Sequence, residues 1–321
     1  FPSAAMRIER RPDGCILVTP ELPLANYLSN LPKVLEQRAA RHPQKTYLAE
    51  RRGGKNSPWT HASYDEINTR SQAFAAWLLA RHIDKSRSVL ILSGNSIAHA
   101  VIKYGAMAAR IPACPVSVNY ALMGGDYGRL KHVIQLVKPA VVFAEQTTLY
   151  KKALENVDFG DAAIITDNPS EITHTVGSGG LFATTDVLAT AITEAVSKSI
   201  EAIEPDEPTL YMLTSGSTSL PKAVIQTQRM LASNLAQGQQ VLGATAGWDD
   251  VMLDWLPWNH VSGAYTKMGT LTSGGTLYID GGRPMPGAFD ESLQNLKEIA
   301  PKFYVNVPFG YAMLADAIEK D

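Results

Sequence analysis

Cysteine is scarce in this sequence, since Cys15 and Cys114 are the only two in 321 residues. Two isolated thiols cannot build a disulfide framework, and neither has a second cysteine or a histidine close by at the spacing of a zinc site. The composition therefore predicts no metal site made by the protein alone. It favours a reducing compartment, which we take to be the cytoplasm.

An excess of one charge and a long apolar run are missing as well. The formal net charge is -2 and the pI is near 6.4, so no basic field draws the chain to nucleic acid or to an anionic bilayer. The first residues lack the pattern of a signal peptide, and no later stretch reaches membrane-spanning length without a charge or a proline. These absences predict a soluble protein with a small-molecule partner and without nucleic-acid or membrane binding.

What the sequence does have is apolar material for a sizeable core. It is 45% hydrophobic and 19% charged, and at 321 residues it exceeds a typical single domain, so one large or two modest domains are expected. It begins at Phe1 without an initiator methionine and ends at Asp321 inside a helical pattern. We therefore expect residues to be missing at one or both ends.

Strand-like and helix-like segments alternate along most of the chain. Apolar residues recur at helical spacing in residues 64–81, whereas short apolar runs bounded by Gly, Asn or Pro are typical of strands. The predicted helices are residues 64–81, 97–109, 126–137, 229–242 and 289–299, and the predicted strands are residues 88–92, 112–116, 140–143, 210–213, 223–226, 251–256, 276–280 and 303–306. This alternation predicts an α/β fold with largely parallel sheets covered on both faces.

A change of composition divides this pattern. Between residues 167 and 208 the chain is rich in Ser, Thr, Gly and acidic residues, which break regular structure. We place a boundary there and predict two stacked αβα subdomains. Residues 1–205 form the first, and residues 206–321 begin the second.

The most informative segment is the loop from Thr214 to Lys222, Thr-Ser-Gly-Ser-Thr-Ser-Leu-Pro-Lys, which lies between two apolar strands. Small residues leave backbone N–H groups uncovered, hydroxyls add donors, and the lysine supplies a positive charge, so the loop suits a polyphosphate. The alternative is a polar hairpin turn without a ligand, because Ser, Gly and Thr are common in turns. The composition of the loop leaves both interpretations open.

The spacing of the loop excludes one class of phosphate site. A Walker loop has the pattern G-x-x-x-x-G-K-S/T, but here Pro221 precedes Lys222 and Ala223 follows it. The run instead resembles the signature T-S-G-S-T-G-x-P-K-G of the adenylate-forming superfamily, which contains acyl- and aryl-CoA ligases, luciferases and peptide-synthetase adenylation domains. It departs from that signature at Ser219 and Ala223, where the family usually has glycine, so we expect a change in the mobility of the loop, in its close approach to phosphate, or in both.

Three later stretches resemble one branch of this superfamily, the bacterial feruloyl-CoA synthases. They are residues 254–260 (Asp-Trp-Leu-Pro-Trp-Asn-His), residues 274–280 (Gly-Gly-Thr-Leu-Tyr-Ile-Asp) and the segment from Asn306 to Leu314. Residues 261–265 do not follow the usual continuation of that branch. The resemblance therefore implies an aromatic, hydroxycinnamic type of acid without fixing which one.

The resemblance implies an AMP-forming acid:CoA ligase that works in two half-reactions. The acid first reacts with ATP to give an acyl-adenylate and pyrophosphate, and the thiol of CoA then displaces AMP. ATP, Mg²⁺ and CoA are the implied cofactors and cosubstrates, and a homodimer is a possible assembly. The first step must hold two anions together and spread the developing negative charge over donors and a metal ion.

The family motifs assign roles to particular residues. The phosphate-binding residues implied are Thr214, Ser215, Gly216, Ser217, Thr218 and Lys222, and Lys222 is also implied as catalytic. His260 is implied beside the acyl pocket and the α-phosphate, as a catalytic and substrate-binding residue. Further substrate-binding residues implied are Trp258, Gly263, Asn306 and Pro308, although a tryptophan beside a proline is more often a core residue.

Two alternatives stay open. The chain could be a degenerate nucleotide-binding paralogue without turnover, since Ser219 and Ala223 replace two glycines, or it could activate a fatty acid or serve as a peptide-synthetase type of adenylation enzyme. The resemblance also implies an N-terminal fragment, because family members continue with further motifs and a small C-terminal domain that carries a catalytic lysine. We expect the fragment alone to be inactive.

Overall fold

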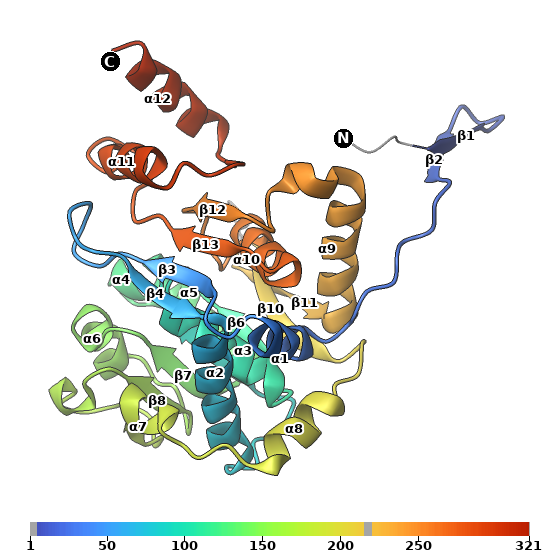
Figure 1. The fold of residues 1–321 in the computed structure, drawn as a ribbon. Helices are drawn as coiled ribbons and strands as arrows, with labels where there is room; N and C mark the ends of the chain where they lie inside the picture. Colours follow the sequence, from blue (N-terminus) through green and yellow to red (C-terminus); the bar gives the residue numbers. More distant parts are fainter. Residues whose placement is uncertain (1–4, 215–219, 321) are drawn as a thin grey trace.

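The computed structural model describes residues 5–214 and 220–320, in which strands and helices alternate as the sequence predicts (Figure 1). The strands are β1 Met6–Arg10, β2 Ile16–Pro20, β3 Thr46–Glu50, β4 Thr60–Ser63, β5 Ser88–Leu92, β6 Ala113–Pro115, β7 Pro139–Ala144, β8 Ala163–Thr166, β9 Leu181–Ala183, β10 Pro208–Thr214, β11 Lys222–Thr227, β12 Val251–Asp254 and β13 Thr276–Ile279. The helices are α1 Leu31–Arg41, α2 Tyr64–Leu79, α3 Ile97–Ala108, α4 Asn119–Leu122, α5 Gly128–Val137, α6 Thr147–Asn156, α7 Thr184–Leu188, α8 Glu194–Glu201, α9 Gln228–Leu242, α10 Val261–Ser273, α11 Phe289–Ile299 and α12 Pro308–Ile318.

The larger sheet contains seven of the described strands in the order β11-β10-β6-β5-β7-β8-β9. Every neighbouring pair is parallel except β10 and β11, which run antiparallel across the loop that joins them. Its central strands β5 and β7 are fully buried, which is why they read as continuous apolar runs in the sequence. The prediction of an α/β fold with largely parallel sheets is confirmed.

The smaller sheet contains four described strands in the order β12-β13-β3-β4. The pairs β12–β13 and β13–β3 are parallel, and β3–β4 is an antiparallel pair. Strands β3 and β4 precede residue 205 in the chain, whereas β12 and β13 follow it. The larger sheet likewise contains strands that precede residue 205 and strands that follow it. The expected boundary near residue 205 therefore does not coincide with a boundary between the two sheets.

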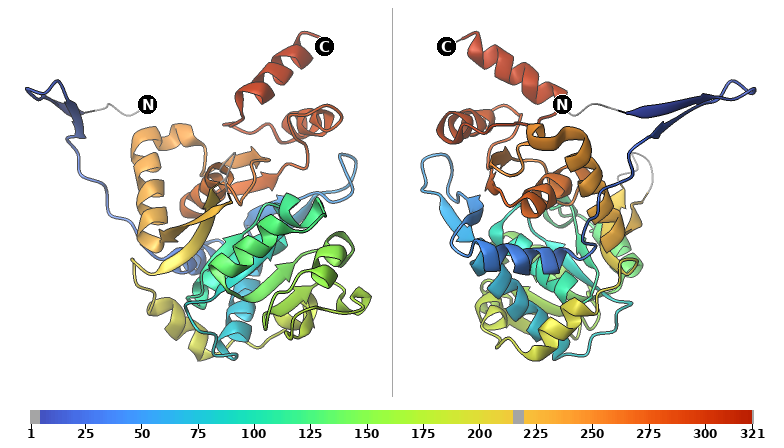
Figure 2. Two further views of the ribbon diagram at one scale, coloured as in Figure 1. Left: turned by 180° about the vertical axis from the view of Figure 1, so that it is seen from behind. Right: turned by 45° about the vertical axis from the view of Figure 1, so that its right-hand side comes forward.

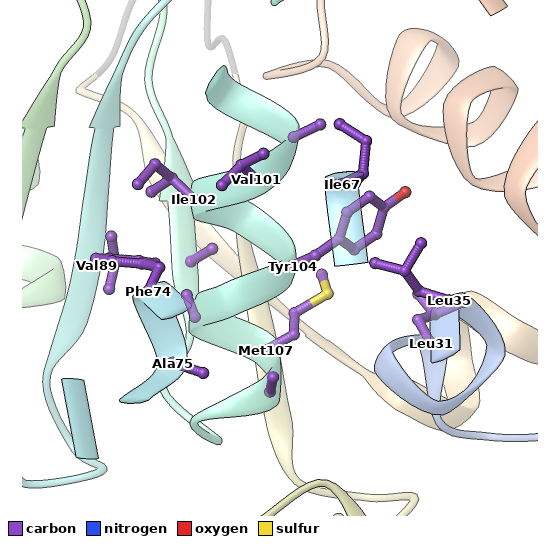
Figure 3. Close-up of a cluster of buried hydrophobic side chains, with 14 of the residues drawn as sticks. Leu31, Leu35, Ile67, Phe74, Ala75, Val89, Val101, Ile102, Tyr104 and Met107 are labelled. Carbon is purple, nitrogen blue, oxygen red and sulfur yellow. The ribbon is translucent and has the colours of Figure 1, made fainter. Parts of the chain in front are cut away.

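Helix α3 lies at the centre of the main hydrophobic core (Figure 3). All of its residues except Ala98 are buried, so it is covered on every side, and the burial includes the polar side chains of His99 and Lys103. Its Gly105 lets α2 approach closely, because a Cβ atom there would lie 2.5 Å from the carbonyl oxygen of Ser71. Leu31, Ile67 and Val89 bring α1, α2 and β5 to the same core.

The expected strand over residues 303–306 is wrong. This segment makes only one isolated bridge, between Met252 and Phe303, and α12 begins shortly afterwards at Pro308. The side chain of Asn306 accepts a hydrogen bond from the backbone N–H of Val307 at 2.8 Å, which turns the chain into the helix. A local side-chain bond of this kind competes with the pairing of a strand.

Two elements extend away from the body of the molecule. The β1–β2 hairpin projects beyond the rest of the fold in every view, and α12 projects at another edge (Figures 1 and 2). Within α12, Gly310 is the only buried residue. No helix in the described ranges has the length and apolar character needed to cross a membrane.

Candidate functional site

The predicted phosphate loop lies at the edge of the larger sheet, between β10 and β11. Thr214 ends β10, Lys222 begins β11, and the two residues are direct partners in the antiparallel pair. The Thr214 hydroxyl donates to the backbone oxygen of Lys222 at 3.4 Å. Ser215, Gly216, Ser217, Thr218 and Ser219 lie outside the described residues, so the structure gives the two ends of this loop.

Both ends of the loop present polar groups to solvent. Thr214 and Lys222 are exposed, whereas Pro221, which precedes Lys222, is buried. The carbonyl oxygen of Pro221 accepts a hydrogen bond of 2.9 Å from Nε2 of His132 on α5. From the sequence, His132 is only one position of the predicted helix over residues 126–137. Its distance along the chain from other polar residues gives no sign that it contacts the end of this loop.

The segment that carries His260 connects β12 to α10 and is held by its own side chains. Asp254 ends β12, and its Oδ1 accepts a hydrogen bond from the backbone N–H of Leu256 at 2.9 Å. Burial raises the pKa of the Asp254 carboxyl to about 7. The predicted strand over residues 251–256 therefore ends at Asp254, because this side chain turns the backbone out of the sheet.

Asn95, in the loop between β5 and α3, fixes the same segment from the other side. Its Nδ2 donates to the carbonyl oxygen of Leu256 at 2.9 Å, and its Oδ1 accepts from the backbone N–H of Trp258 at 2.9 Å. One amide thus satisfies both a donor and an acceptor of the turn. This contact joins the loop after a strand of the larger sheet to the loop after a strand of the smaller one.

His260 occupies the N-cap position of α10 and is exposed. Its Nδ1 lies 3.0 Å from the hydroxyl of Ser262 in the first turn of the helix. The N-terminus of a helix carries free N–H groups and a partial positive charge, so this end of α10 favours an anion. His260 therefore lies at the positive end of the α10 dipole.

Trp258 lies in the core and not on an open surface. Its side chain is 1% exposed, the Nζ of Lys267 lies 4.2 Å from its ring centroid, and the His99 ring meets it edge-on at 5.3 Å. Its predicted contact with a substrate is therefore not open from solvent in this structure. The role it shows here is to join α3 and α10.

Gly263 is required by the packing of α10 on the preceding turn. A Cβ atom at this position would lie 2.1 Å from the carbonyl oxygen of Leu256 and 2.7 Å from that of Pro257. Only a residue without a side chain allows this approach. The glycine thereby fixes the distance between the helix and the segment before His260.

Asn306 joins the site segment, and Pro308 does not. The Oδ1 of Asn306 accepts a hydrogen bond of 3.0 Å from Nε1 of Trp255, so residue 306 lies against the segment after β12. Pro308 is the exposed first residue of α12. Within the described ranges, no hydrogen bond or ion pair links Lys222 to the His260 segment. The predicted residues thus form two separate groups, with Thr214 and Lys222 on the larger sheet and the residues around His260 after a strand of the smaller sheet.

The donor set for a metal ion is sparse. The described residues contain no group of three or more His, Cys, Asp or Glu side chains that could hold one. Magnesium in nucleotide sites is usually held by one or two carboxylates together with substrate phosphates and water. A metal here would depend mainly on oxygen atoms that a ligand brings.

Comparisons with known proteins identify relatives of the whole arrangement. A family model described as AMP-binding enzyme matches residues 35–321. The chain is 25% identical over 217 residues to the 4-chlorobenzoate–CoA ligase of an Arthrobacter species, which covers 67% of this chain and 37% of that enzyme. It is 23% identical over 274 residues to long-chain-fatty-acid–CoA ligase 2 of Schizosaccharomyces pombe, which covers 81% of this chain and 38% of that enzyme.

A solved structure has the same fold at low identity. The o-succinylbenzoate coenzyme A synthetase of Bacillus subtilis, in complex with AMP, superposes with a TM-score of 0.64 at 19% identity, over 92% of this chain and 52% of that chain. The chain thus spans less than two-fifths of the length of the curated relatives described above.

Proposed function

The chain belongs to the AMP-binding enzyme family, and on this basis we propose that the protein activates a carboxylic acid with ATP and transfers the acyl group to CoA. In the first half-reaction a carboxylate oxygen bonds to the α-phosphorus of ATP while the bond to pyrophosphate breaks. In the second, the CoA sulfur loses its proton and bonds to the acyl carbon while AMP leaves. Both steps need groups that stabilise negative charge as it moves.

The observation that carries the proposal is the pairing of Thr214 with Lys222 at the base of the Ser/Gly/Thr loop. The pairing holds an exposed ammonium and an exposed hydroxyl side by side, at an end of the sheet where nothing described covers them. We propose that Lys222 and Thr214 bind ATP phosphates together with Ser215, Gly216, Ser217 and Thr218. Bound Mg²⁺ would neutralise charge on the same phosphates.

His260 has a separate role in the proposal. It is exposed at the N-terminus of α10, where the helix dipole favours a carboxylate or an α-phosphate oxygen. We propose that His260 orients these groups. Asn306 is tied to the same segment through Trp255 and would line the acid's site.

We propose an aromatic acid of the hydroxycinnamic type as the substrate. Support comes from the three stretches that resemble feruloyl-CoA synthases and from a relative whose name states 4-chlorobenzoate. A relative named for long-chain fatty acids supports the alternative of a fatty-acyl enzyme. A homodimer and a cytoplasmic location stay predictions.

The experiment that tests the activity is acid-dependent exchange of labelled pyrophosphate into ATP by the intact protein. A panel of hydroxycinnamic, benzoic and long-chain fatty acids is compared, with the 321-residue chain assayed beside the intact protein. We expect exchange with hydroxycinnamic acids and none from the chain alone. Loss of exchange in Lys222→Ala, but not in the exposed control Lys152→Ala on α6, would support phosphate binding at the loop.

The degenerate alternative has its own test. Ser219 and Ala223 stand where the family has glycine, so a Ser219→Gly, Ala223→Gly double variant restores the family pattern. If only the double variant exchanges pyrophosphate, the natural protein binds nucleotide without turnover. Equal exchange by both proteins contradicts that alternative.

A further inference from the structure

Helices α3 and α10 meet at a group of buried nitrogen atoms that the proposed reaction does not use. The group consists of Lys103 and His99 on α3, Lys267 on α10 and Trp258 before it, and we call it the buried basic cluster. Lys103 and Lys267 are 0% exposed, and His99 and Trp258 are 1% exposed. Within the described ranges, both Nζ atoms, Nε2 of His99 and Nε1 of Trp258 lack a hydrogen-bond partner.

The members of the cluster lie close together. His99 and Lys103 are four residues apart on α3, so they share one face of the helix. The Nζ of Lys267 lies 4.2 Å from the ring centroid of Trp258 and 5.0 Å from that of Tyr104. The ring of His99 packs edge-on to Trp258 at 5.3 Å, so Trp258 touches both helices.

Hydrogen bonds of the neighbouring groups leave the two amines without an acceptor. Nδ1 of His99 lies 2.9 Å from the carbonyl oxygen of Gly94, and because a carbonyl only accepts, Nδ1 carries the hydrogen. The hydroxyls of Tyr47 and Tyr104 bond to each other at 2.7 Å. Tyr47 lies against the backbone oxygen of Lys267, at 3.1 Å, and not against its amine.

Two of the buried carboxylates near the helices, Glu50 and Glu145, are occupied elsewhere, whereas Oδ2 of the buried Asp254 lacks a hydrogen-bond partner within the described ranges. Glu50 accepts hydrogen bonds from Arg52 and from the backbone N–H of Ile97, and Glu145 bonds to Arg52 and Ser93. The charges that act on the cluster are its own members. Burial, and then repulsion from Lys103, lowers the pKa of Lys267, while burial and both lysines lower the pKa of His99.

We propose that the buried basic cluster binds one small, carboxylate-sized anion between Lys103 and Lys267. Burying two amines without a counter-charge is costly, and an anion placed between them would give each ammonium a partner. Charge-assisted hydrogen bonds from two lysines are strong in a dry site, and the free Nε1 of Trp258 adds a third donor. His99 would donate from Nε2 as well once the anion raises its pKa.

The carboxylate that binds to the buried basic cluster could come from two sources. The first is a free small anion such as formate. The second is a distal carboxylate on the acid substrate, a possibility that rests on the proposed function. Lys267 lies seven residues beyond His260, which corresponds to about 10 Å along α10, and since Lys267 is 0% exposed, a distal carboxylate reaches it only when the segment around Trp258 moves aside.

The first experiment needs no catalysis and uses formate as the probe. Thermal unfolding is followed against formate concentration, with ionic strength held constant by a bulky organosulfonate and formamide as the uncharged comparison. Formate is expected to raise the Tm of the natural protein in a saturable manner, and formamide is not. Lys103→Met and Lys267→Met should weaken the half-saturation by about tenfold or more, while the exposed control Lys152→Met behaves like the natural protein.

Methionine is an unbranched side chain of similar volume to lysine but without its charge, so both variants should fold and have a higher Tm than the natural protein without formate. If formate raises the Tm of both lysine variants with the same half-saturation as in the natural protein, the proposal is overturned. Broadening of the ¹³C-formate resonance by the natural protein measures binding without any variant. Absence of that broadening also overturns the proposal.

The second experiment identifies the source of the carboxylate. Pyrophosphate exchange by the intact protein is compared for acids of equal length with and without a distal carboxyl group. A preference for the diacid that Lys267→Met abolishes identifies the substrate as the source, and formate binding without such a preference identifies a free anion. If no acid supports exchange but formate binds, the proposed function fails while the anion site stands.

Discussion

The side-chain Oδ1 of Asn95 accepts a hydrogen bond from the backbone N–H of Trp258 at 2.9 Å, although the two residues are 163 positions apart in the chain. The same side chain donates to the carbonyl oxygen of Leu256. The loop after β5 thus fixes the turn that leads to His260. The position of a candidate catalytic residue therefore depends on contact between the loops of two different sheets.

Replacing Asn95 by alanine should loosen this turn. The change removes both hydrogen bonds and leaves polar backbone groups of a partly buried turn unpaired, so we expect the free energy of unfolding to fall by about 1–3 kcal/mol. Urea denaturation measures this loss. Asn95→Asp keeps the acceptor and should lose less, and the exposed Asn156→Ala, which removes one local bond on α6, should lose least. Equal losses in Asn95→Ala and Asn156→Ala would show that the turn does not depend on Asn95.

Replacing Gly263 by alanine should push α10 away from the segment before it. The new Cβ would lie 2.1 Å from the carbonyl oxygen of Leu256, so backbone must move, and we expect destabilisation of about 1–3 kcal/mol. Gly94→Ala is the matched control, since nothing lies within 4 Å of its Cβ position. Thermal unfolding of both variants checks the difference, and an unchanged Tm for Gly263→Ala contradicts the close approach.

Replacing His260 by alanine should reduce pyrophosphate exchange without reducing stability. The side chain is exposed and contacts Ser262 alone among its described hydrogen-bond partners, so little folding energy depends on it. We expect exchange to fall by about tenfold to a thousandfold if His260 orients reacting groups. Ser262→Ala tests whether the His260–Ser262 contact matters, and a smaller effect is expected. An unchanged rate in His260→Ala would remove it from the site.

Asp254 should make stability depend on pH. Burial raises the pKa of its carboxyl to about 7 in the folded protein, against 3.8 for the unfolded chain. Between these values the folded state binds more protons than the unfolded state, so the free energy of unfolding decreases as pH rises from about 4 to 7. The full effect of this group is roughly 4 kcal/mol. Urea denaturation at several pH values should show this slope, and Asp254→Asn should reduce it; the same slope in both proteins contradicts the assignment.

Lys103 should give a slope of opposite sign in a higher range. Burial lowers the pKa of its amine to about 7, against 10.5 for the unfolded chain. Between these values the unfolded state binds more protons, so stability increases as pH rises from about 7 to 10.5. The measurement is made without formate or other small carboxylates. Lys103→Met should reduce the slope that Lys152→Met retains in full, and Lys267, whose pKa is also lowered by burial, accounts for the remainder.

Local sequence patterns predicted β5, β6, β7, β10 and β11 of the larger sheet but missed β8 and β9. Apolar runs such as Ser88–Leu92 and Pro139–Ala144 are buried on both faces, so each carries a signal that does not depend on its neighbours. The Ser/Gly/Thr loop and its lysine also form a local pattern, and the spacing of Lys222 and Pro221 excluded a Walker loop. The roles of Thr214, Lys222 and His260 stay predictions that the mutants above test.

The segment over residues 303–306 and the residues around His260 show where local patterns fail. An apolar run predicts a strand only if a sheet edge is free to pair with it, and here the Asn306 side chain turns the chain into α12 instead. Trp258 and Gly263 were assigned to substrate from sequence position. Burial of the tryptophan and the close approach at the glycine show packing roles that only neighbouring elements reveal.

The sequence by itself determined the alternation of strands and helices and the family, because periodicity and motif spacing are encoded within short stretches of chain. Tertiary structure alone decided that β3 and β4 join β12 and β13, that Asn95 holds the turn before His260, and that Lys103 and Lys267 are both buried. Each of these depends on contacts between residues far apart in sequence. Such contacts form because α3 is covered on all sides, and burial there brings side chains together that no local pattern relates.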